Sequence, residues 1–393
     1  MNVAVLGLGR VGLPLATYLR SLGHEVIGYD ADPTRTSRLL AGFSDMPWEP
    51  GINEGPHQIV DIAADVGAAV ADAELVYIIV STPMERQITG CFLSSQYVEN
   101  ALQSISGNLG NGVVVVIGST LEPADAARIC IGGCVYNPPL IRLGHVIEDL
   151  RNASVGLVGG IDSDEVERVV KMWGWEDGPL RTTVIRGDPL SIATAKLAIN
   201  VTLSMRIAWA NEISEICATS GASSQTVLSA VRADPRIGAG FMQAGFPPGG
   251  PCLPRDLAVW GRRRVAFLAR RVETRHRDAR EAIIDKTVQA VQQLCAETVP
   301  RVAVLGLVYN VGAMDSTDSL GVALMREFVK LEWQAVGYDP IVGQSKLYFP
   351  FPTTTVVREA VERSMVVILT VSWPEFERLP LVGVPVIDLR RPK

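Results

Sequence analysis

The chain contains two series of short apolar runs that follow the same order. The runs are short, mainly apolar and rich in β-branched residues, as expected of parallel strands that are covered on both faces. The runs at 2–9, 26–30 and 75–80 correspond to the runs at 301–308, 335–339 and 366–371. Polar, helix-compatible stretches separate them. The pattern therefore predicts an α/β fold with two doubly wound, Rossmann-like domains over 1–185 and 298–393.

A different pattern fills the region between the two predicted domains. From Ser191 to Ser220 the sequence contains neither Gly nor Pro, and its apolar residues cover most of a helical circumference. These residues include Leu203, Met205, Ile207, Trp209, Ile213 and Ile216. We expect a long central helix over about 189–222 within a small helical domain, 186–297, and expect it to form a homodimer interface. Burial inside one domain without dimerisation is the alternative.

Composition excludes several classes of protein. The 393 residues are 48% hydrophobic and 20% charged, with a net charge of −6, which is typical of a globular protein. Arginines are scattered apart from short clusters such as Arg262–Arg264, so we expect no nucleic-acid partner. The longest apolar runs, such as 113–117, are too short to span a bilayer, and we expect no membrane partner. A strand-like run already begins at residue 2, which predicts a cytoplasmic protein.

The six cysteines and four histidines show no paired metal-ligand spacing. No Cys-x-x-Cys pair is present, so neither a disulfide scaffold nor a metal site is expected.

The first predicted strand leads into the glycine-rich sequence Gly-Leu-Gly-Arg-Val-Gly. Glycines at these positions allow a tight turn and let the backbone approach a pyrophosphate at a helix N-terminus. Asp30 ends the second strand, where a carboxylate binds the adenosine ribose and repels a 2′-phosphate, so NAD is favoured over NADP. The expected cofactor-binding residues here are Gly7, Gly9, Arg10, Val11, Gly12, Asp30 and Arg35. A strand–helix turn without a ligand is the alternative.

The second half does not repeat this glycine spacing. The segment from Gly306 to Gly312 lacks the spaced glycines, so we expect that this domain does not bind a dinucleotide in the same way.

Cys252 lies in a loop rich in Gly and Pro, and Asp256 follows it by four residues. A thiol can hold an aldehyde as a thiohemiacetal, which then gives up a second hydride. A dinucleotide-binding start combined with this loop therefore suggests oxidation of an alcohol to an acid. A cysteine buried as a small hydrophobic residue is the alternative.

Taken along its whole length, the chain resembles the UDP-glucose/GDP-mannose 6-dehydrogenase family. Beside the glycine fingerprint, the resemblance rests on Glu49–Ile52, Thr82–Pro83, Gly118–Thr120, Asn137–Pro138, Lys196 with Asn200, Asn211–Glu212, Asp234–Gly238, the Cys252 loop, Tyr338–Pro340 and Trp373–Phe376. It implies NAD-dependent, two-step oxidation of the C6 hydroxymethyl group of a nucleotide sugar, of the UDP-glucose type, to a uronate. These residues do not select between uracil and guanine.

The resemblance also implies roles for individual residues. Cys252 is the nucleophile, Lys196 and Asn200 stabilise an oxyanion, and Asp256 assists proton transfer. Thr120 and Thr82 are expected near the cofactor, with Thr120 also near an ordered water. Arg236 is expected to reach the substrate of a neighbouring subunit. The implied substrate-binding residues are Leu140, Arg142, Lys196, Asn200, Arg236, Phe246 and Gly249.

Spacing agrees with part of this assignment. Lys196 and Asn200 are four residues apart, so they project from one face of a helix and can donate to one oxygen. A solvated or salt-bridged Lys196 is the alternative, and Asn200 could equally satisfy buried backbone groups. Asp256 could simply pair with Arg255 or cap the following helix.

The sequence also departs from the family pattern. Pro139 and Leu143 stand where carboxylates are typical, and Asn310 and Thr317 stand where cations are expected to contact the substrate. Loss of a general base typically costs about 10²–10⁴-fold in rate.

Three hypotheses remain. We prefer the two-step dehydrogenase because Cys252, Lys196, Asn200, Asp256 and Arg236 are all present. The second is a related dehydrogenase that stops at an aldehyde, accumulates a thioester or oxidises a smaller hydroxy acid. The third is a non-catalytic homologue that binds NAD or a nucleotide.

Overall fold

The computed structural model describes residues 1–41, 60–87, 90–176, 182–295, 298–342, 349–379, 381 and 383–390. The motif at Glu49–Ile52 lies outside these residues. The chain forms two compact units, Met1–Ala198 and Ile199–Lys393, called unit 1 and unit 2 below. The domain boundaries expected at 185/186 and 297/298 remain predictions.

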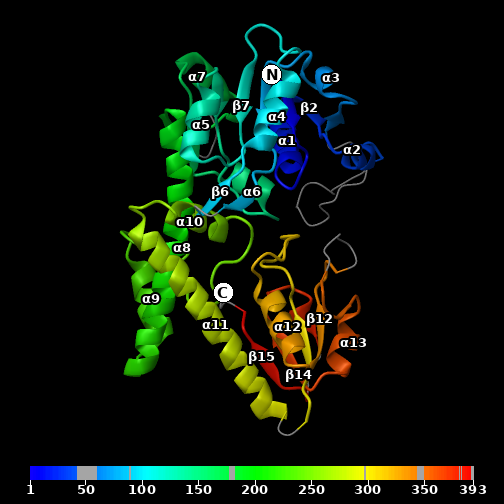
Figure 1. Cartoon of the computed structure of the whole chain (residues 1–393), viewed down its shortest axis with the longest axis vertical. Coiled ribbons are helices and arrows are strands. Elements are labelled where there is room, and N and C mark those ends of the chain that lie inside the picture. The colour runs from blue at the N-terminus through cyan, green and yellow to red at the C-terminus, as the bar shows by residue number, and fades with distance from the viewer. Residues whose placement is uncertain are drawn as a thin grey trace. The chain divides into compact units, whose positions relative to one another are not determined.

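Unit 1 is built on a mainly parallel sheet (Figure 1). Within the described residues its strand order is β10-β9-β8-β7-β4-β1-β2-β3, and only β8 and β9 pair antiparallel. The strands are β1 (Asn2–Leu6), β2 (Glu25–Tyr29), β3 (Asp61–Ile62), β4 (Leu75–Ile78), β7 (Val114–Ile117), β8 (Cys134–Tyr136), β9 (Val155–Gly159) and β10 (Thr183–Gly187). A separate hairpin pairs β5 (Met84–Gln87) with β6 (Gly90–Leu93).

Helices connect these strands. They are α1 (Gly12–Ser21), α2 (Pro33–Leu40), α3 (Val66–Val70), α4 (Gln96–Ile105), α5 (Pro123–Cys130), α6 (Val146–Arg151) and α7 (Ser163–Trp173). Aspartates begin several of them: the side chains of Asp32, Asp65 and Asp162 each accept a hydrogen bond from a backbone N–H in the first turn. Apolar residues of α1, α6 and α7 pack with the central strands into one buried core.

Unit 2 contains a smaller, fully parallel sheet in the order β13-β12-β11-β14-β15. Its strands are β11 (Arg301–Leu305), β12 (Gln334–Tyr338), β13 (Thr353–Thr354), β14 (Val366–Leu369) and β15 (Val386–Asp388). Its helices are α9 (Ser224–Ala233), α10 (Leu253–Gly261), α11 (Phe267–Cys295), α12 (Leu320–Lys330) and α13 (Val357–Glu362), followed by a 3₁₀ turn at Phe376–Arg378.

The repeat seen in the sequence is a repeat of structure. β1 pairs with β2 and β4, and β11 pairs with β12 and β14 in the equivalent arrangement. The registers also agree: Asn2 is opposite Glu25 and Arg301 is opposite Gln334. The predicted α/β class with Rossmann-like parallel sheets is confirmed.

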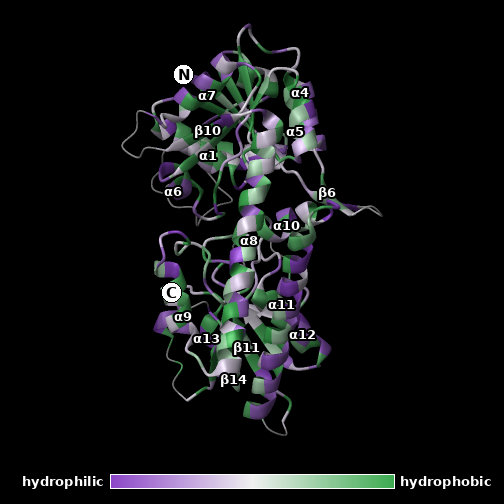
Figure 2. Cartoon of the chain, turned by 90° about the vertical axis from the view of Figure 1, so that its left-hand side faces the viewer, coloured by the Kyte–Doolittle hydropathy of each residue, from purple (hydrophilic) through white to green (hydrophobic). Residues whose placement is uncertain are grey.

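The predicted central helix is also confirmed, as α8 (Pro189–Ser220), which begins in unit 1 and continues into unit 2. Its apolar residues differ in burial. Ile207 and Ile213 are buried, whereas Trp209 and Ile216 are exposed in the single chain, so the predicted homodimer interface stays a prediction. Figure 2 shows α8 with both hydrophobic and hydrophilic segments along its length. Among the described residues, no helix combines the length and the hydropathy needed to cross a membrane.

Candidate active site

The glycine-rich turn joins β1 to α1 at very close range. Gly7 adopts φ +96°, which favours glycine, and a Cβ atom there would lie 2.4 Å from the backbone oxygen of Ile79. A Cβ atom on Gly12 would lie 1.7 Å from the oxygen of Gly7. Both positions therefore require glycine, and they bring the first turn of α1 against the end of β1.

Asp30 and Arg35 flank this turn. Asp30 Oδ2 accepts a hydrogen bond of 2.7 Å from Leu8 N–H and lies 3.4 Å from Arg35 Nη1. A Cβ atom on Gly9 would lie 3.3 Å from the same Arg35 nitrogen. Arg10 is exposed and Val11 half-buried just before α1 begins. The turn, the helix start and the carboxylate thus form the phosphate and ribose elements that a dinucleotide needs, and NAD fits this set.

The loops after β4 and β7 lie at the same edge of the sheet, because β1, β4 and β7 are adjacent parallel strands. Thr82 is buried and Thr120 half-buried in these loops. Ser119 joins the two loops: its hydroxyl donates to Val80 O at 2.8 Å and accepts from Val80 N–H at 2.9 Å. The sequence interpretation did not name Ser119 as a site residue, although a polar residue directly after a parallel strand signals such a position.

The loop after β8 contacts the proposed catalytic lysine. Lys196 is buried, and its Nζ donates a hydrogen bond of 2.9 Å to Pro139 O. The solvated alternative for Lys196 is therefore wrong. Leu143 is buried. Neither leucine nor proline carries an ionisable side chain, so neither can take over the role of the expected carboxylate. Leu140 is half-buried between them.

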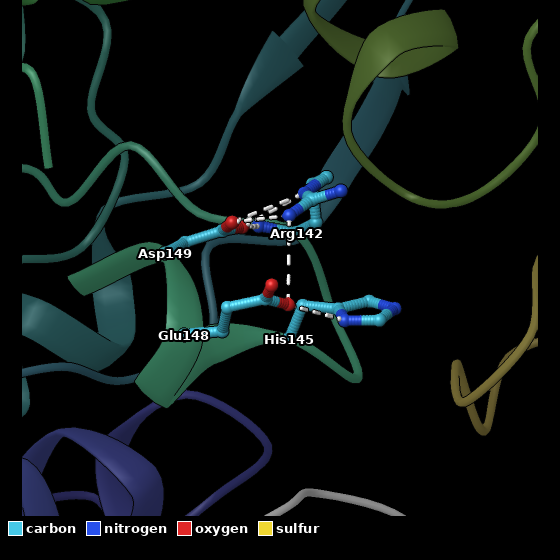
Figure 3. Close-up of polar contacts among 4 residues, drawn as sticks. All are labelled: Arg142, His145, Glu148 and Asp149. Carbon is cyan, nitrogen blue, oxygen red and sulfur yellow. Dashed lines mark hydrogen bonds and ion pairs between the residues drawn. The ribbon is translucent and has the colours of Figure 1, made fainter. Parts of the chain in front are cut away.

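Arg142, from the same loop, is held by acidic residues of α6 (Figure 3). Its Nη2 lies 2.5 Å from Asp149 Oδ1, and its backbone N–H donates to Asp149 Oδ2 at 2.6 Å. The hydrogen bond between the guanidinium and Asp149 raises the pKa of Arg142. His145 Nδ1 lies 2.9 Å from Glu148 Oε2 in the same cluster. A substrate anion at Arg142 would have to share the guanidinium with Asp149.

Cys252 lies at the N-terminus of α10, where it is half-buried. Asp256 N–H donates to Cys252 O at 2.9 Å in the first turn of the helix. Cys252 is therefore not a fully buried residue, and the positive end of the helix dipole favours negative charge at this position.

Asp256 is fully buried and connects two other residues that the sequence singled out. It accepts hydrogen bonds from Asn200 Nδ2 at 2.6 Å and from Arg255 Nε at 2.8 Å. The pairing with Arg255 considered as an alternative is present, and it coexists with the contact to Asn200. The structure thus brings Asn200, Asp256 and the start of the Cys252 helix together.

Glycines let the Cys252 loop lie directly on the segment 309–318. Gly250 adopts φ +81° and donates to Thr317 O at 2.8 Å, and a Cβ atom on it would lie 2.7 Å from the Tyr309 ring. A Cβ atom on Gly249 would lie 2.8 Å from Asp318 O. Phe246 has its side chain buried in the core of the unit 2 sheet.

Arg280, on α11, is a cation that the sequence interpretation missed. Its Nη1 donates to Asp318 Oδ1 at 3.1 Å, and its guanidinium carbon lies 5.1 Å from the centre of the Phe246 ring. Asp318 adopts φ +52°, a conformation uncommon outside glycine. Arg280 thus places positive charge beside Thr317, where the sequence lacks the expected arginine. No local sequence pattern links residues 280 and 318.

Arg236 lies on an exposed turn, with 87% of its side chain accessible, and pairs with Asp234 Oδ2 at 2.6 Å. Arg206 fixes the end of this turn by donating to the backbone oxygens of Ile237 and Gly238 at 2.8 Å and 2.6 Å.

In unit 2, the helix and strand joined by the turn after β11 approach each other as closely as those around the glycine turn of unit 1. The two glycines that allow this approach, Gly306 and Gly321, are farther apart in the sequence than Gly7 and Gly12. A Cβ atom on Gly321 would lie 1.9 Å from Gly306 O, as Gly12 approaches Gly7 in unit 1. Asp339 takes the place of Asp30, but it is fully buried and accepts from the N–H groups of Leu307 and Val308. Burial raises the pKa of Asp339. That this domain does not bind a dinucleotide in the same way stays a prediction.

Comparison with known proteins identifies the family. The family model for the NAD-binding domain of UDP-glucose/GDP-mannose dehydrogenases matches residues 1–174, and the model for the central domain matches residues 191–265. The chain belongs to the UDP-glucose/GDP-mannose dehydrogenase family. It is accordingly an NAD-dependent oxidoreductase related to nucleotide-sugar dehydrogenases, as its sequence predicts.

Relatives match this family member over nearly its whole length. A UDP-glucose 6-dehydrogenase of Rhizobium meliloti is 28% identical and covers 96% of this chain and 91% of its own. The structure of a UDP-glucose dehydrogenase from Pyrobaculum islandicum matches with a TM-score of 0.85 at 25% identity, over 99% of this chain and 94% of that one. A UDP-D-ManNAc dehydrogenase from Pyrococcus horikoshii shares the fold, with a TM-score of 0.78 at 20% identity and 99% of each chain covered.

Proposed function

We propose that this protein oxidises the C6 hydroxymethyl group of a nucleotide sugar of the UDP-glucose type twice, forming a uronate through Cys252. The position of Cys252 carries the proposal. It is half-buried at the N-terminus of α10, and the buried Asp256 of the same helix turn contacts Asn200. A nucleophile, a polar group for its oxyanion and a proton-handling carboxylate are what this two-step chemistry requires.

The chemistry divides between the cofactor and the chain. Bound NAD⁺, held by the turn from Gly7 to Gly12 and by Asp30, supplies the hydride acceptor, one molecule for each oxidation. Lys196 accepts the hydroxyl proton in the first oxidation. Cys252 Sγ then adds to the aldehyde carbon, and the thiol proton passes to the carbonyl oxygen to give a thiohemiacetal. The second oxidation leaves a thioester, in which water breaks the C–S bond and releases the carboxylate and the thiol.

Substrate binding needs positive charge, and Arg280 supports this part of the proposal. It lies against Asp318 and Phe246, beside the Gly249–Gly250 segment of the Cys252 loop. We infer that Arg280 supplies one cation for the diphosphate in place of the side chain missing at Thr317. A charge-assisted hydrogen bond of this kind contributes roughly 1.5–3 kcal/mol.

A second candidate function is a dehydrogenase whose thioester on Cys252 persists. The buried, apolar Leu143 and the prolyl residue at Pro139 favour it, because neither can activate the water for hydrolysis.

A screen for NADH release over UDP- and GDP-sugars tests the proposal, together with intact-mass analysis after a single turnover. We expect two NADH per substrate and uronate release. Cys252→Ser should abolish acid formation and retain NAD binding. Cys91 is also half-buried, and Cys91→Ser should change neither acid formation nor NAD binding. Undiminished acid output from Cys252→Ser would refute the role of the thiol.

The other hypotheses give different outcomes in the same experiment. A persistent adduct on Cys252 supports the second candidate, and binding without any NADH release would identify a non-catalytic homologue. The homodimer prediction has a test of its own. Trp209 and Ile216 of α8 are exposed apolar side chains, and a second copy of the chain could cover them. Light scattering of the purified protein measures the oligomeric state directly.

A further inference from the structure

Tyr77 is a buried polar residue that has no role in the reaction proposed above. It belongs to β4, and its side chain is fully buried. Burial raises the pKa of Tyr77 well above its ordinary value, so the hydroxyl keeps its proton at neutral pH and remains a hydrogen-bond donor. The sequence interpretation did not single out Tyr77, because it lies inside an apolar run.

The phenol ring of Tyr77 crosses the end of the neighbouring strand. β4, β7 and β8 are adjacent in the sheet, with β7 in the middle. Gly118 follows β7 directly, and a Cβ atom there would lie 2.2 Å from Tyr77 Cε1 and 3.1 Å from the hydroxyl oxygen. Gly118 therefore leaves the space through which the ring passes, and a larger residue would displace the ring.

The hydroxyl of Tyr77 reaches Asn137, the first residue after β8. The hydroxyl oxygen lies 2.5 Å from Asn137 O and 3.0 Å from Asn137 Oδ1. Oδ1 also accepts from Trp173 Nε1 at 2.7 Å, whereas Nδ2 donates to Leu157 O at 2.7 Å. The backbone N–H donates to Ile117 O at 2.9 Å. Each polar atom of Asn137 thus has a partner, and Tyr77 supplies the donor for the backbone oxygen.

Asn137 lies two residues before the oxygen that holds Lys196. Lys196 is buried, and its Nζ donates to Pro139 O at 2.9 Å. Prolines at 138 and 139 restrict two consecutive φ angles to about −65°, so the segment between Asn137 and this oxygen has little freedom. The position of Pro139 O, and with it that of Lys196 Nζ, therefore depends on how firmly Asn137 is held.

We propose that Tyr77 is a positioning residue for Lys196. Its hydroxyl fixes the main chain at Asn137, and the rigid segment 137–139 then presents the oxygen that orients the lysine amine. Because Tyr77 is fully buried, it acts through Asn137 and not on the substrate. Its effect on catalysis rests on the proposed function, in which Lys196 accepts the hydroxyl proton of the substrate.

Tyr77 also connects this loop with the cofactor side of the sheet. Gly118, which packs on the Tyr77 ring, begins the loop that carries Thr120. Ser119 bonds to both the N–H and the oxygen of Val80 in the loop after β4. The loops after β4, β7 and β8 are therefore held together. A displacement of about 1 Å in such a support can cost about 10²-fold in rate, so a buried hydroxyl can affect catalysis from a distance.

Steady-state kinetics of Tyr77→Phe tests the proposal. The variant keeps the ring against Gly118 and removes only the hydroxyl. We expect kcat for NADH formation from UDP-glucose to fall by about tenfold, while KM for UDP-glucose and KM for NAD⁺ stay within about twofold. General loosening of the fold would change KM as well, so the separation of kcat from KM identifies a positioning role.

A second measurement needs no turnover. Acetic anhydride acetylates lysines, and peptide mass spectrometry measures the rate at each position. In Tyr77→Phe the acetylation of Lys196 should be about threefold faster or more, because Nζ is held less firmly at Pro139 O. The exposed Lys171 provides the internal reference, and its rate should not change.

Tyr18→Phe is the matched control. The rings of Tyr18 and Tyr77 each lie 6.2 Å from the Trp173 ring, measured between ring centres. Tyr18 belongs to α1, and none of the Asn137 hydrogen bonds described above involves it. Tyr18→Phe should therefore leave kcat, KM and the acetylation of Lys196 unchanged. Circular dichroism checks that both variants are folded.

Three results would overturn the proposal. Two of them are an unchanged kcat and an unchanged rate of Lys196 acetylation in Tyr77→Phe. The third is an equal fall of kcat in Tyr18→Phe, since loss of any hydroxyl from this core would then have the same effect. If the wild type forms no NADH from any nucleotide sugar, the proposed function fails, and the acetylation rates still decide whether Tyr77 positions Lys196.

Discussion

Gly12 and Gly321 occupy equivalent positions in the first turns of α1 and α12, the helices that approach β1 and β11. We expect the same substitution to destabilise both units but to affect cofactor binding in only one. A Cβ atom would lie 1.7 Å from Gly7 O in Gly12→Ala and 1.9 Å from Gly306 O in Gly321→Ala. Real Cβ contacts essentially never fall under 3.0 Å, so the start of α1 or α12 must move by about 1.1–1.3 Å.

The size of the effect follows from two opposing contributions. Overpacking against a well-packed neighbour typically costs about 1–3 kcal/mol, and a backbone obstacle that cannot rotate away places these sites at the upper end. Alanine is a better helix former than glycine by about 1 kcal/mol, which offsets part of this cost. We therefore expect each variant to lose about 2 kcal/mol in the free energy of unfolding of its unit.

The two variants should differ in cofactor binding. Gly12→Ala displaces the helix start that faces the pyrophosphate, so the affinity for NAD should fall by about an order of magnitude or more. Gly321→Ala should leave that affinity unchanged. Urea unfolding followed by circular dichroism measures stability, limited proteolysis identifies the unit that opens, and calorimetry measures NAD binding.

Two open glycines serve as controls. Gly107→Ala in unit 1 and Gly240→Ala in unit 2 place a Cβ atom where no other atom lies within 4 Å. They should leave stability unchanged or slightly increased. If Gly321→Ala unfolds at the same urea concentration as Gly240→Ala, or if Gly12→Ala binds NAD like the wild type, the close approach of helix and strand is not what these glycines provide.

Three further predictions follow from single sites. Asn137→Ala leaves buried partners unpaired, including Trp173 Nε1 at 2.7 Å, and should lower the free energy of unfolding by about 3 kcal/mol in urea titrations. Arg280→Gln should raise KM for the nucleotide sugar by about tenfold and leave kcat unchanged in steady-state assays. Burial raises the pKa of Cys130 to about 12 and of Cys134 to about 11, so alkylation at pH 8 should be slow and rise about tenfold per pH unit, as peptide mass spectrometry can measure.

Matched residues control these predictions. Asn108→Ala, at an exposed position, should not change stability, and Arg277→Gln, on the same helix as Arg280, should not change KM. A KM change of equal size in both arginine variants would show that Arg280 acts only through the net charge of α11. Rapid alkylation of Cys130 at pH 8 would contradict its burial.

Local patterns were sufficient to predict much of this fold. The repeated apolar runs predicted three strands of each sheet, β1, β2 and β4 and β11, β12 and β14, and the absence of Gly and Pro after Ser191 predicted α8. The glycine turn and Asp30 predicted the cofactor edge of unit 1. These features are readable because neighbouring residues set strand, helix and turn geometry through backbone sterics and the spacing of apolar side chains.

The sequence could not identify contacts between residues that are far apart along the chain. Asn200 and Asp256 were both named in advance, but only the packing of α8 and α10 shows that they bond to each other. Arg280 lies beside Asp318 because α11 runs past the segment 309–318, and no periodicity in either segment encodes that meeting.

The amino-acid sequence by itself determined which segments form strands, turns and helices and which residue types are available for chemistry. The tertiary structure alone decided which of those residues meet and which remain exposed. Val265 and Phe267 belong to an ordinary apolar run, yet they face outward because Ala266 and Ala269 occupy the inner face against α8 and α10. Burial depends on which neighbour covers a side chain, and that neighbour is brought close only when the chain folds.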